Sequence, residues 1–232
     1  MMKYNLPRQV SRLDLKPIIE REIKKQEIAV MTLTKKQQEE LKTIVEVIEA
    51  KGLPEYLIRR KLPHNLGHGI FLHPGKDPLP RGRLIVPYSG EKEIVPAEYE
   101  GGHYAFTPLE KIYLSREEQA FLDPTITYKA RRSYTLKVDA LQRGNFARFV
   151  NHSSTPNIEA RLCRVPKNSF GLRASPIEVI YFVSKRILPG QQLLVCYEGE
   201  ENCYWNEEGI KPFPMTPSTF QLSSDLKIIS EK

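Results

Sequence analysis

Apolar residues in the first 63 positions recur every three or four residues, the spacing typical of amphipathic helices. Residues 16–28 carry four isoleucines at this spacing, and residues 34–52 show it more clearly. Thr34 can cap the second helix, and Gly52 can end it. The apolar face of this helix comprises Leu41, Ile44, Val45 and Ile48. It either packs within the chain or pairs two copies, so a homodimer through the N-terminal helices remains an open alternative.

From about residue 64 the pattern changes to short runs rich in β-branched and aromatic residues, separated by glycine and proline. Such runs predict strands with a turn about every dozen residues. The predicted strands are residues 69–73, 82–90, 133–141, 146–150, 159–165, 178–187 and 192–199. Residues 108–123 predict an inserted helix. The chain is therefore expected to be mainly β, with several small sheets in residues 64–200.

The two ends of the chain differ from this β-rich part. Residues 1–63 form the predicted N-terminal helical extension, and residues 201–232 form a tail. The tail after Trp205 is rich in proline and serine, which favours irregular structure. It also carries Phe213 and Phe220, which can dock on the rest of the chain. Three domains or segments are therefore expected, with boundaries near residues 63 and 200.

Composition narrows the class of protein. The chain has 232 residues, of which 40% are hydrophobic and 27% charged, as in soluble globular proteins. No apolar run approaches the roughly 18 residues of a membrane span, and we expect no membrane association. Three cysteines are too few for a disulfide framework or paired zinc knuckles, which favours reduced thiols and no metal. A net charge of +7 favours polyanions, so weak or indirect nucleic-acid association is compatible with the sequence.

Several motifs follow one another in a fixed order. They read LGHG at residues 66–69, GRLIVPYSGE at 82–91, SYTLKVD at 133–139, GNFARFVNHSSTPN at 144–157 and RILPGQQLLVCYEG at 186–199. This series resembles the SET-domain protein lysine methyltransferases in content and in order. It is most similar to the bacterial chlamydial-type SET proteins, which have a comparable size and an N-terminal helical extension.

The resemblance implies the SET-domain β-clip fold, in which small sheets surround a threaded pseudoknot. The segment with Asn151 and His152 then passes beneath a loop made by the later strand that ends at Tyr197. Such threading is rare, and it brings two distant pieces of chain together. The candidate site is expected where these two pieces meet.

The resemblance also implies that S-adenosylmethionine is the cofactor. The glycines of the turn let backbone approach the cofactor closely, because glycine lacks a side chain. Asn151 can accept from the cofactor's ammonium, and His152 can present backbone groups to the adenine. Arg148 either braces this segment or contacts the cofactor, and Trp205 either stacks over adenine or packs in the tail. The expected cofactor-binding residues are Gly67, His68, Gly69, Ser133, Tyr134, Arg148, Asn151, His152 and Trp205.

Tyr197 is the expected catalytic tyrosine, and Tyr134 and Tyr88 are expected to line the lysine channel. Lysine has a pKa of about 10.4, so making it neutral near pH 7.4 costs about 4 kcal/mol. A narrow aromatic channel disfavours the ammonium by desolvation, and the positive sulfur of the cofactor disfavours it further. Tyr197 then aligns the amine and the methyl group. Alternatively, Tyr88 and Tyr134 are half-buried aromatic residues of strands, which β propensity alone would favour.

The sequence also departs from the family pattern. Position 154 is serine, where many members have a zinc-binding cysteine, and the tail has only Cys203. This argues against a zinc cluster, so the tail must close the site without metal. Val195, two residues before Tyr197, replaces the aromatic residue that often tunes the number of methyl groups. A hydrolase with Ser153 and His152 as its Ser-His pair is an alternative hypothesis, but residues adjacent in sequence rarely have the geometry that such a pair needs.

The expected activity is methylation of lysine in a histone or a histone-like basic protein. The main alternative is a non-catalytic SET-like module that binds basic protein tails. A third hypothesis is a basic nucleic-acid-associated protein that uses the helical extension as its contact. The resemblance to chlamydial proteins suggests the bacterial cytoplasm, or secretion into a host cell with action in its nucleus.

Overall fold

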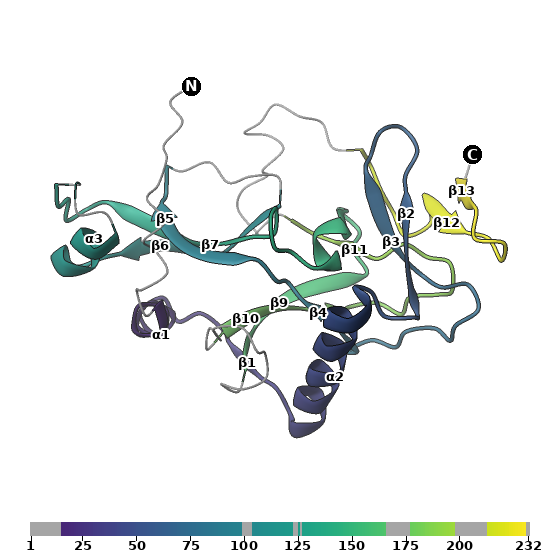
Figure 1. The fold of residues 1–232 in the computed structure, drawn as a ribbon, viewed down its shortest axis with the longest axis horizontal. Coiled ribbons are helices and arrows are strands. Elements are labelled where there is room, and N and C mark those ends of the chain that lie inside the picture. The colour runs from purple at the N-terminus through teal and green to yellow at the C-terminus, as the bar shows by residue number, and fades with distance from the viewer. Residues whose placement is uncertain are drawn as a thin grey trace. The chain divides into compact units, whose positions relative to one another are not determined.

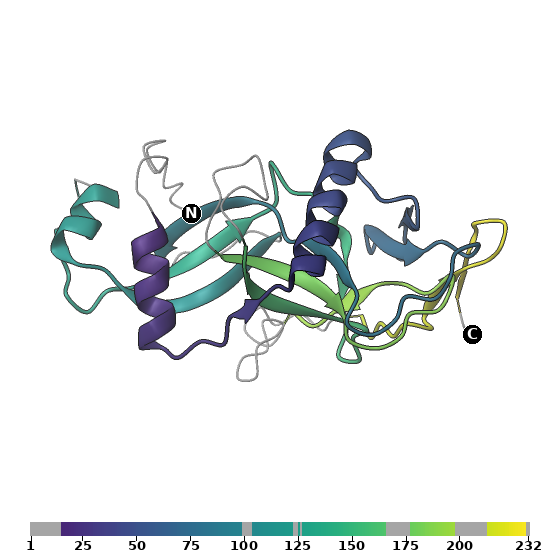
Figure 2. The ribbon, with the colours of Figure 1, turned by 90° about the horizontal axis from the view of Figure 1, so that it is seen from below.

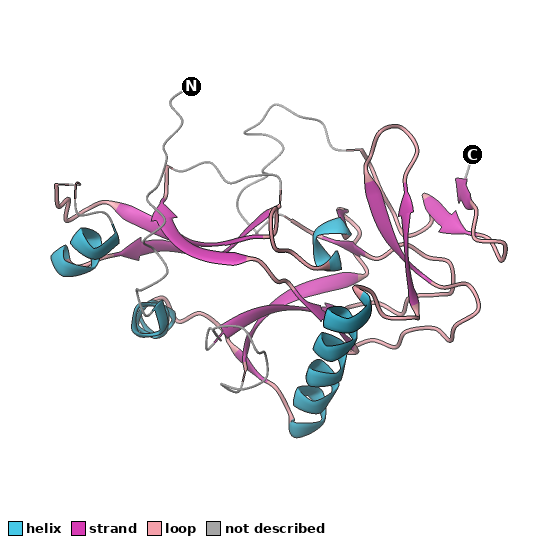
Figure 3. Ribbon diagram, viewed as in Figure 1, coloured by secondary structure: helices cyan, strands magenta, loops and turns pink. Residues whose placement is uncertain are grey.

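The structure is a computed structural model that describes residues 15–98, 104–122, 125, 127–165, 177–197 and 213–230. The chain is mainly β, with several small sheets and N-terminal helices, as predicted (Figure 3). It groups into two compact units (Figure 1). Met1–Val30 and Ser89–Gly144 form the first unit, and Met31–Tyr88 and Asn145–Lys232 form the second. The boundaries predicted near residues 63 and 200 stay predictions.

The first unit contains an antiparallel three-stranded sheet in the order β5-β7-β6, with β5 at Glu91–Pro96, β6 at Ala105–Tyr113 and β7 at Ser133–Asp139. Two helices belong to the same unit, α1 at Leu15–Lys25 and α3 at Arg116–Leu122. Arg21 of α1 donates to Glu118 of α3 at 2.7 Å. This hydrogen bond raises the pKa of Arg21. The predicted first helix is therefore present and is tied to its own unit.

The helix predicted for residues 108–123 is wrong in its first half, which forms β6. Leu109 and Ile112 are three residues apart and both buried, a spacing that imitates a helix. They pair with Leu136 and Tyr134 of β7, and the register shifts between them. Lys111 has a positive φ of 53° inside this irregularity. The bulge therefore turns both apolar side chains to one face, and only Arg116–Leu122 is helical.

The second unit is built on a six-stranded sheet. Its main path runs β4-β10-β9-β11-β8, and β1 at Met31–Thr32 also pairs with β9. The other strands are β4 at Leu84–Pro87, β8 at Asn151–His152, β9 at Ile158–Arg164, β10 at Ile177–Val183 and β11 at Leu194–Val195. Every residue of β10 is buried, as expected of a central strand.

Helix α2, Lys35–Lys51, covers one face of this sheet (Figure 2). Thr34 and Gln37 form a capping box, and Gly52 ends the helix with a φ of 73°, as predicted. Leu41 and Ile44 are buried against Leu84, Ile180 and other residues of the sheet, and Val45 and Ile48 pack beside them. The apolar face of α2 thus packs within the chain, which is the first of the two alternatives that the sequence left open for this helix.

Two antiparallel pairs complete the second unit. One pairs β2 at Leu57–Lys61 with β3 at His68–Leu72, and the other pairs β12 at Phe220–Leu222 with β13 at Ile228–Ser230. The second pair corrects the expectation of an irregular tail. Leu222 donates its backbone N–H to the Gly190 carbonyl at 2.8 Å. Phe220, Met215 and Leu222 pack with Ile58 and Phe71, so the tail shares a core with the first pair.

The strand predicted for residues 146–150 is also wrong, because Phe146–Phe149 form a 3₁₀ helix. The side chain of Asn145 accepts from the Ala147 backbone N–H at 3.0 Å and caps this turn. The Asn145 amide also donates to the Pro87 carbonyl at 2.7 Å. A local side-chain hydrogen bond therefore outweighs the β propensity of this short apolar run.

Candidate active site

The site forms where β8 and β11 lie side by side. The two strands are parallel, with Leu194 opposite Asn151 and Val195 opposite His152. Ser153 donates its backbone N–H to the Val195 carbonyl at 3.0 Å. Segments about forty residues apart in sequence are thus adjacent in space, as the resemblance to the SET-domain family implies.

The buried side chain of Asn157 stabilises the contact between these two segments. It is 2% exposed, and its amide nitrogen donates to the Gln192 carbonyl at 2.8 Å. Its amide oxygen accepts from the Leu194 backbone N–H, also at 2.8 Å. One side chain therefore completes the hydrogen bonds of a neighbouring strand. Sequence reasoning gave Asn157 no role of its own, although it belongs to the NHSSTPN run.

Tyr197 follows β11 and reaches back to the 3₁₀ helix. Its hydroxyl donates to the Val150 carbonyl at 2.6 Å, and its backbone N–H donates to Nδ1 of His152 at 3.1 Å. The two rings are 5.5 Å apart. Because Nδ1 accepts, the neutral ring carries its proton on Nε2. These contacts place Tyr197, which is 42% exposed, beside the Asn-His pair.

Asn151 joins this cluster to the glycine turn. Its amide nitrogen donates to the His68 carbonyl at 2.8 Å. Among the described residues its amide oxygen has no donor, which leaves an acceptor for a cation such as an ammonium. Ser153 points elsewhere, because its hydroxyl donates to the Met215 carbonyl. The hydrolase pairing of Ser153 with His152 is therefore not the arrangement found.

The two glycines of the turn serve different purposes. Gly67 has a φ of 72°, and a Cβ there would meet no atom within 4 Å, so open space lies beside it. A Cβ on Gly69 would lie 2.6 Å from Nε2 of Gln192, a fully buried side chain. Gly69 thus allows close packing inside the protein, whereas Gly67 provides the left-handed turn and the open approach that a ligand needs.

Arg148 and His68 gather around Phe149. The Arg148 guanidinium lies 4.8 Å from the centroid of the Phe149 ring, and the His68 ring lies 5.7 Å from it. His68 is exposed and Arg148 is half-buried. The stack braces the segment, which is one of the two roles expected for Arg148, and it leaves positive charge close to Asn151.

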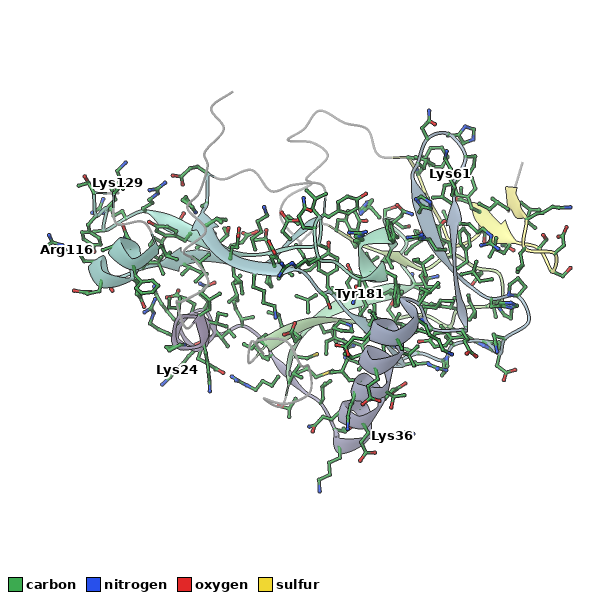
Figure 4. All side chains as sticks on the ribbon, in the orientation of Figure 1. Lys24, Lys36, Lys61, Arg116, Lys129 and Tyr181 are labelled. Carbon is green, nitrogen blue, oxygen red and sulfur yellow. The ribbon has the colours of Figure 1, made fainter. Side chains whose placement is uncertain are left out.

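Tyr88 has an aromatic neighbour that the sequence analysis missed. The Tyr88 and Tyr181 rings are 5.9 Å apart, and both residues are buried. Burial raises the pKa of Tyr181 well above its ordinary value, and the nearby Tyr197 and Tyr88 raise it further. Tyr181 lies in β10 (labelled in Figure 4), within an apolar run that gave no signal of a site. The predicted Tyr88 and Tyr197 thus have a third tyrosine near them, Tyr181, that was not predicted.

The tail contributes a smaller aromatic group. The Phe213 ring stacks on His64 at 6.0 Å and on Phe220 at 5.9 Å. Phe220 is 1% exposed and belongs to the core, whereas Phe213 is 39% exposed. Of these two aromatics, Phe213 is thus the one that is exposed at the surface.

The remaining predicted residues belong to the first unit or to the tail. Ser133 and Tyr134 begin β7 of the first unit, where Arg132 lies 5.6 Å from the centroid of the Tyr134 ring. Their predicted roles stay predictions. Trp205 and Cys203 lie outside the described residues. In the part of the chain that the structure describes, no three His, Cys, Asp or Glu residues gather as metal ligands would. No helix in that part is long and apolar enough to span a membrane.

Comparisons with known proteins agree with this architecture. A SET domain family matches residues 67–198, more than half of the chain. A mouse (Mus musculus) histone-lysine N-methyltransferase, SETMAR, is 27% identical over 129 residues, which cover 52% of this chain and 34% of SETMAR. An H3 lysine-4 specific histone-lysine N-methyltransferase from Schizosaccharomyces pombe is 35% identical over 75 residues, covering 32% of this chain and 7% of that protein.

The solved structure of the ATXR5 SET domain, in complex with methylated histone H3, has a TM-score of 0.51 and 19% identity. The match covers 76% of this chain and 72% of ATXR5. The fold is thus that of a SET domain. The chain belongs to the SET domain family, and it spans about a third or less of the curated relatives that it matches.

Proposed function

We propose that this chain is an S-adenosylmethionine-dependent protein-lysine N-methyltransferase that acts on histones or histone-like basic proteins. The observation that carries the proposal is the junction of β8 and β11, where Tyr197, His152 and Asn151 meet. The names of the curated relatives above, both histone-lysine N-methyltransferases, support the same reaction.

The residues of the site fit the cofactor. An open left-handed turn at Gly67 lies beside an amide oxygen of Asn151 that is available to an ammonium group. When bound, the cofactor supplies an electrophilic methyl group on a positive sulfur. Asn151, His68 and the backbone of this turn would hold it. The fit depends on charge and on space rather than on any metal.

Tyr197 and the surrounding backbone would position the amine. The Tyr197 hydroxyl donates its proton to the Val150 carbonyl, so its oxygen keeps lone pairs that can accept from the lysine amine. Tyr88 and Tyr181 are buried side by side. Burial raises the pKa of Tyr181 well above its ordinary value, so this ring stays neutral, and such a desolvated aromatic surrounding favours a neutral amine over an ammonium. Alignment of a neutral amine supplies much of the rate.

Methyl transfer to histones from labelled S-adenosylmethionine tests the proposal. Tyr197→Phe removes the hydroxyl and is expected to lower the rate about a hundredfold, and Asn151→Ala is expected to weaken cofactor binding. Tyr128→Phe, the same change at a tyrosine that is 41% exposed, should leave the rate unchanged. If no label reaches any protein, the chain itself included, the proposal is wrong.

The same experiment addresses the alternative, a non-catalytic SET-like module that binds basic tails. Such a module would hold a histone tail without transferring label. We also propose, from the motif resemblance alone, that the chain is of the bacterial chlamydial type. It would then act in the bacterial cytoplasm or as an effector secreted into a host cell and active in its nucleus. Detection of the protein in the nuclei of infected cells would test that placement.

A further inference from the structure

Gln192 is a fully buried polar residue that lies next to the glycine turn at residues 67–69. Its relative exposure is 0%. It forms an antiparallel bridge with Phe71 of β3, and the following Leu193 donates its backbone N–H to the Ile70 carbonyl at 2.8 Å. The chain that leads into β11 therefore runs along β3, the strand that the glycine turn opens.

The side chain of Gln192 occupies the space that a side chain at Gly69 would need. A Cβ on Gly69 would lie 2.6 Å from Nε2 and 3.2 Å from Cδ of Gln192. The amide thus lies against the backbone of the turn at a distance that only glycine permits. Nε2 also lies 4.0 Å from the sulfur of Met215, a tail residue that is 8% exposed. The amide of Gln192 therefore contacts both the turn and the tail.

This amide contributes through its shape more than through hydrogen bonds. Among the described residues, the Gln192 side-chain oxygen is buried without a hydrogen-bond partner. A thioether such as that of Met215 is a weak acceptor for the amide nitrogen. A buried amide that is poorly paired lowers stability, so its presence in a folded chain needs a reason. The close packing against Gly69 supplies this reason.

The position of the turn in its own right decides the orientation of Asn151. The His68 carbonyl, one residue before Gly69, accepts from the Asn151 amide nitrogen at 2.8 Å. The oxygen and nitrogen of an amide belong to one planar group, so this hydrogen bond also fixes where the Asn151 oxygen points. Gln192 is a firm support for the turn, because its own carbonyl accepts from the buried Asn157 at 2.8 Å.

We propose that Gln192 is a positioning residue that holds the glycine turn, and through it Asn151, in the geometry that binds the cofactor. The inference rests on the proposed function, because the turn and Asn151 belong to the proposed cofactor site. Since Gln192 is fully buried, it acts through the turn on the affinity for the cofactor and leaves the methyl-transfer step itself unchanged.

Calorimetry with S-adenosylhomocysteine, combined with methyl transfer at saturating S-adenosylmethionine, tests the assignment. Gln192→Ala removes the support and is expected to raise the Kd about tenfold, with kcat close to that of the wild type. Gln192→Met keeps the length and volume of the side chain, so it should retain the wild-type Kd.

The glycine that meets this side chain gives a reciprocal test. Gly69→Ala should raise the Kd, because the added methyl group collides with Gln192. Combining it with Gln192→Ala should lower the Kd below that of Gly69→Ala alone, because the smaller side chain makes room. Gly75→Ala is the matched control, since a Cβ there would meet no atom closer than 3.4 Å. It should leave Kd and kcat unchanged.

Melting temperatures show which variants are folded at the temperature of the assay. If Gln192→Ala is unfolded, Gln192→Asn takes its place, because it shortens the side chain by one methylene and keeps the amide. A raised Kd with unchanged kcat in the shortened variant, absent in Gln192→Met, supports the assignment.

The other outcomes separate this inference from the proposed function. An unchanged Kd in the shortened variant overturns the assignment and leaves the proposed function intact. Equal losses of affinity in Gln192→Ala and Gln192→Met also overturn it, because the polar groups and not the packing would then matter. A kcat that falls as much as the affinity does so too, since the residue would then support the structure as a whole. A wild-type chain that neither binds S-adenosylhomocysteine nor transfers methyl groups overturns both proposals.

Discussion

Asn157 shows how one buried residue holds the two halves of the site together. Its amide satisfies the Gln192 carbonyl and the Leu194 N–H, both next to β11. Asn157→Ala would leave these two backbone groups buried without partners, at a cost of about 3 kcal/mol in the free energy of unfolding. Urea unfolding would measure the loss. A loss below about 1 kcal/mol would mean that the strands meet without this brace.

Cys163 gives a second residue-scale prediction. It is fully buried under α2, and burial raises its thiol pKa to about 12. The thiolate is the reactive form, so alkylation of Cys163 by iodoacetamide at pH 8 should require unfolding. The raised pKa favours the neutral thiol in the folded state, so its contribution to stability is present below the ordinary pKa and is lost as the pH rises toward 12.

Mass spectrometry of native and urea-treated samples measures the alkylation of Cys163. The half-buried Cys196 is the internal comparison. Cys196 is expected to label faster than Cys163 in the native protein. Labelling of Cys163 at the same rate with and without urea would show that the α2 core opens readily.

At the scale of elements, the turn before the closing strand is coupled to the tail. Gly190 has a φ of 82°, and a Cβ there would lie 2.5 Å from the Leu222 carbonyl oxygen of β12. Gly190→Ala combines backbone strain with a clash against backbone, so it should displace the β12–β13 pair and destabilise the protein by more than about 1 kcal/mol.

Gly82→Ala is the matched control. Gly82 has a φ of 83°, and a Cβ there would meet no atom within 4 Å. It therefore shares the strain and lacks the clash, and the difference between the two melting temperatures isolates the contact with the tail. Equal shifts in the two variants would show that the tail does not depend on this turn.

The elements also show what could be predicted from the sequence. The caps at Thr34 and Gly52 define α2 because capping chemistry is local. The strand content of β7, β9 and β10 follows from runs of apolar residues. The register-shifted β6 could not be found this way, because its buried Leu109 and Ile112 depend on pairing with β7. The Asn145 cap that converts residues 146–149 into a 3₁₀ helix also outweighs the apolar pattern.

The site was predictable to the extent that its residues lie in motifs. Asn151, His152 and Tyr197 meet as the resemblance to the SET-domain family implies. Tyr181 was not predictable, because a tyrosine in a fully buried strand resembles any other core residue.

At the scale of the whole molecule, the net charge of +7 predicts weak and sequence-independent binding to DNA. Such binding releases counterions, so affinity for a short duplex should fall steeply with salt. Fluorescence anisotropy at several salt concentrations, with duplexes of different sequence, would measure it. Affinity that differs between sequences, or that is insensitive to salt, would contradict a purely electrostatic association.

The central claim is that the junction of β8 and β11 moves a methyl group from S-adenosylmethionine to a lysine amine. Tandem mass spectrometry of histones incubated with the protein and S-adenosylmethionine tests it most directly. The account predicts methyl groups on lysine side chains that depend on both the protein and the cofactor and that are strongly reduced with Tyr197→Phe. Histones that stay unmodified, or methyl groups found only on residues other than lysine, would contradict it.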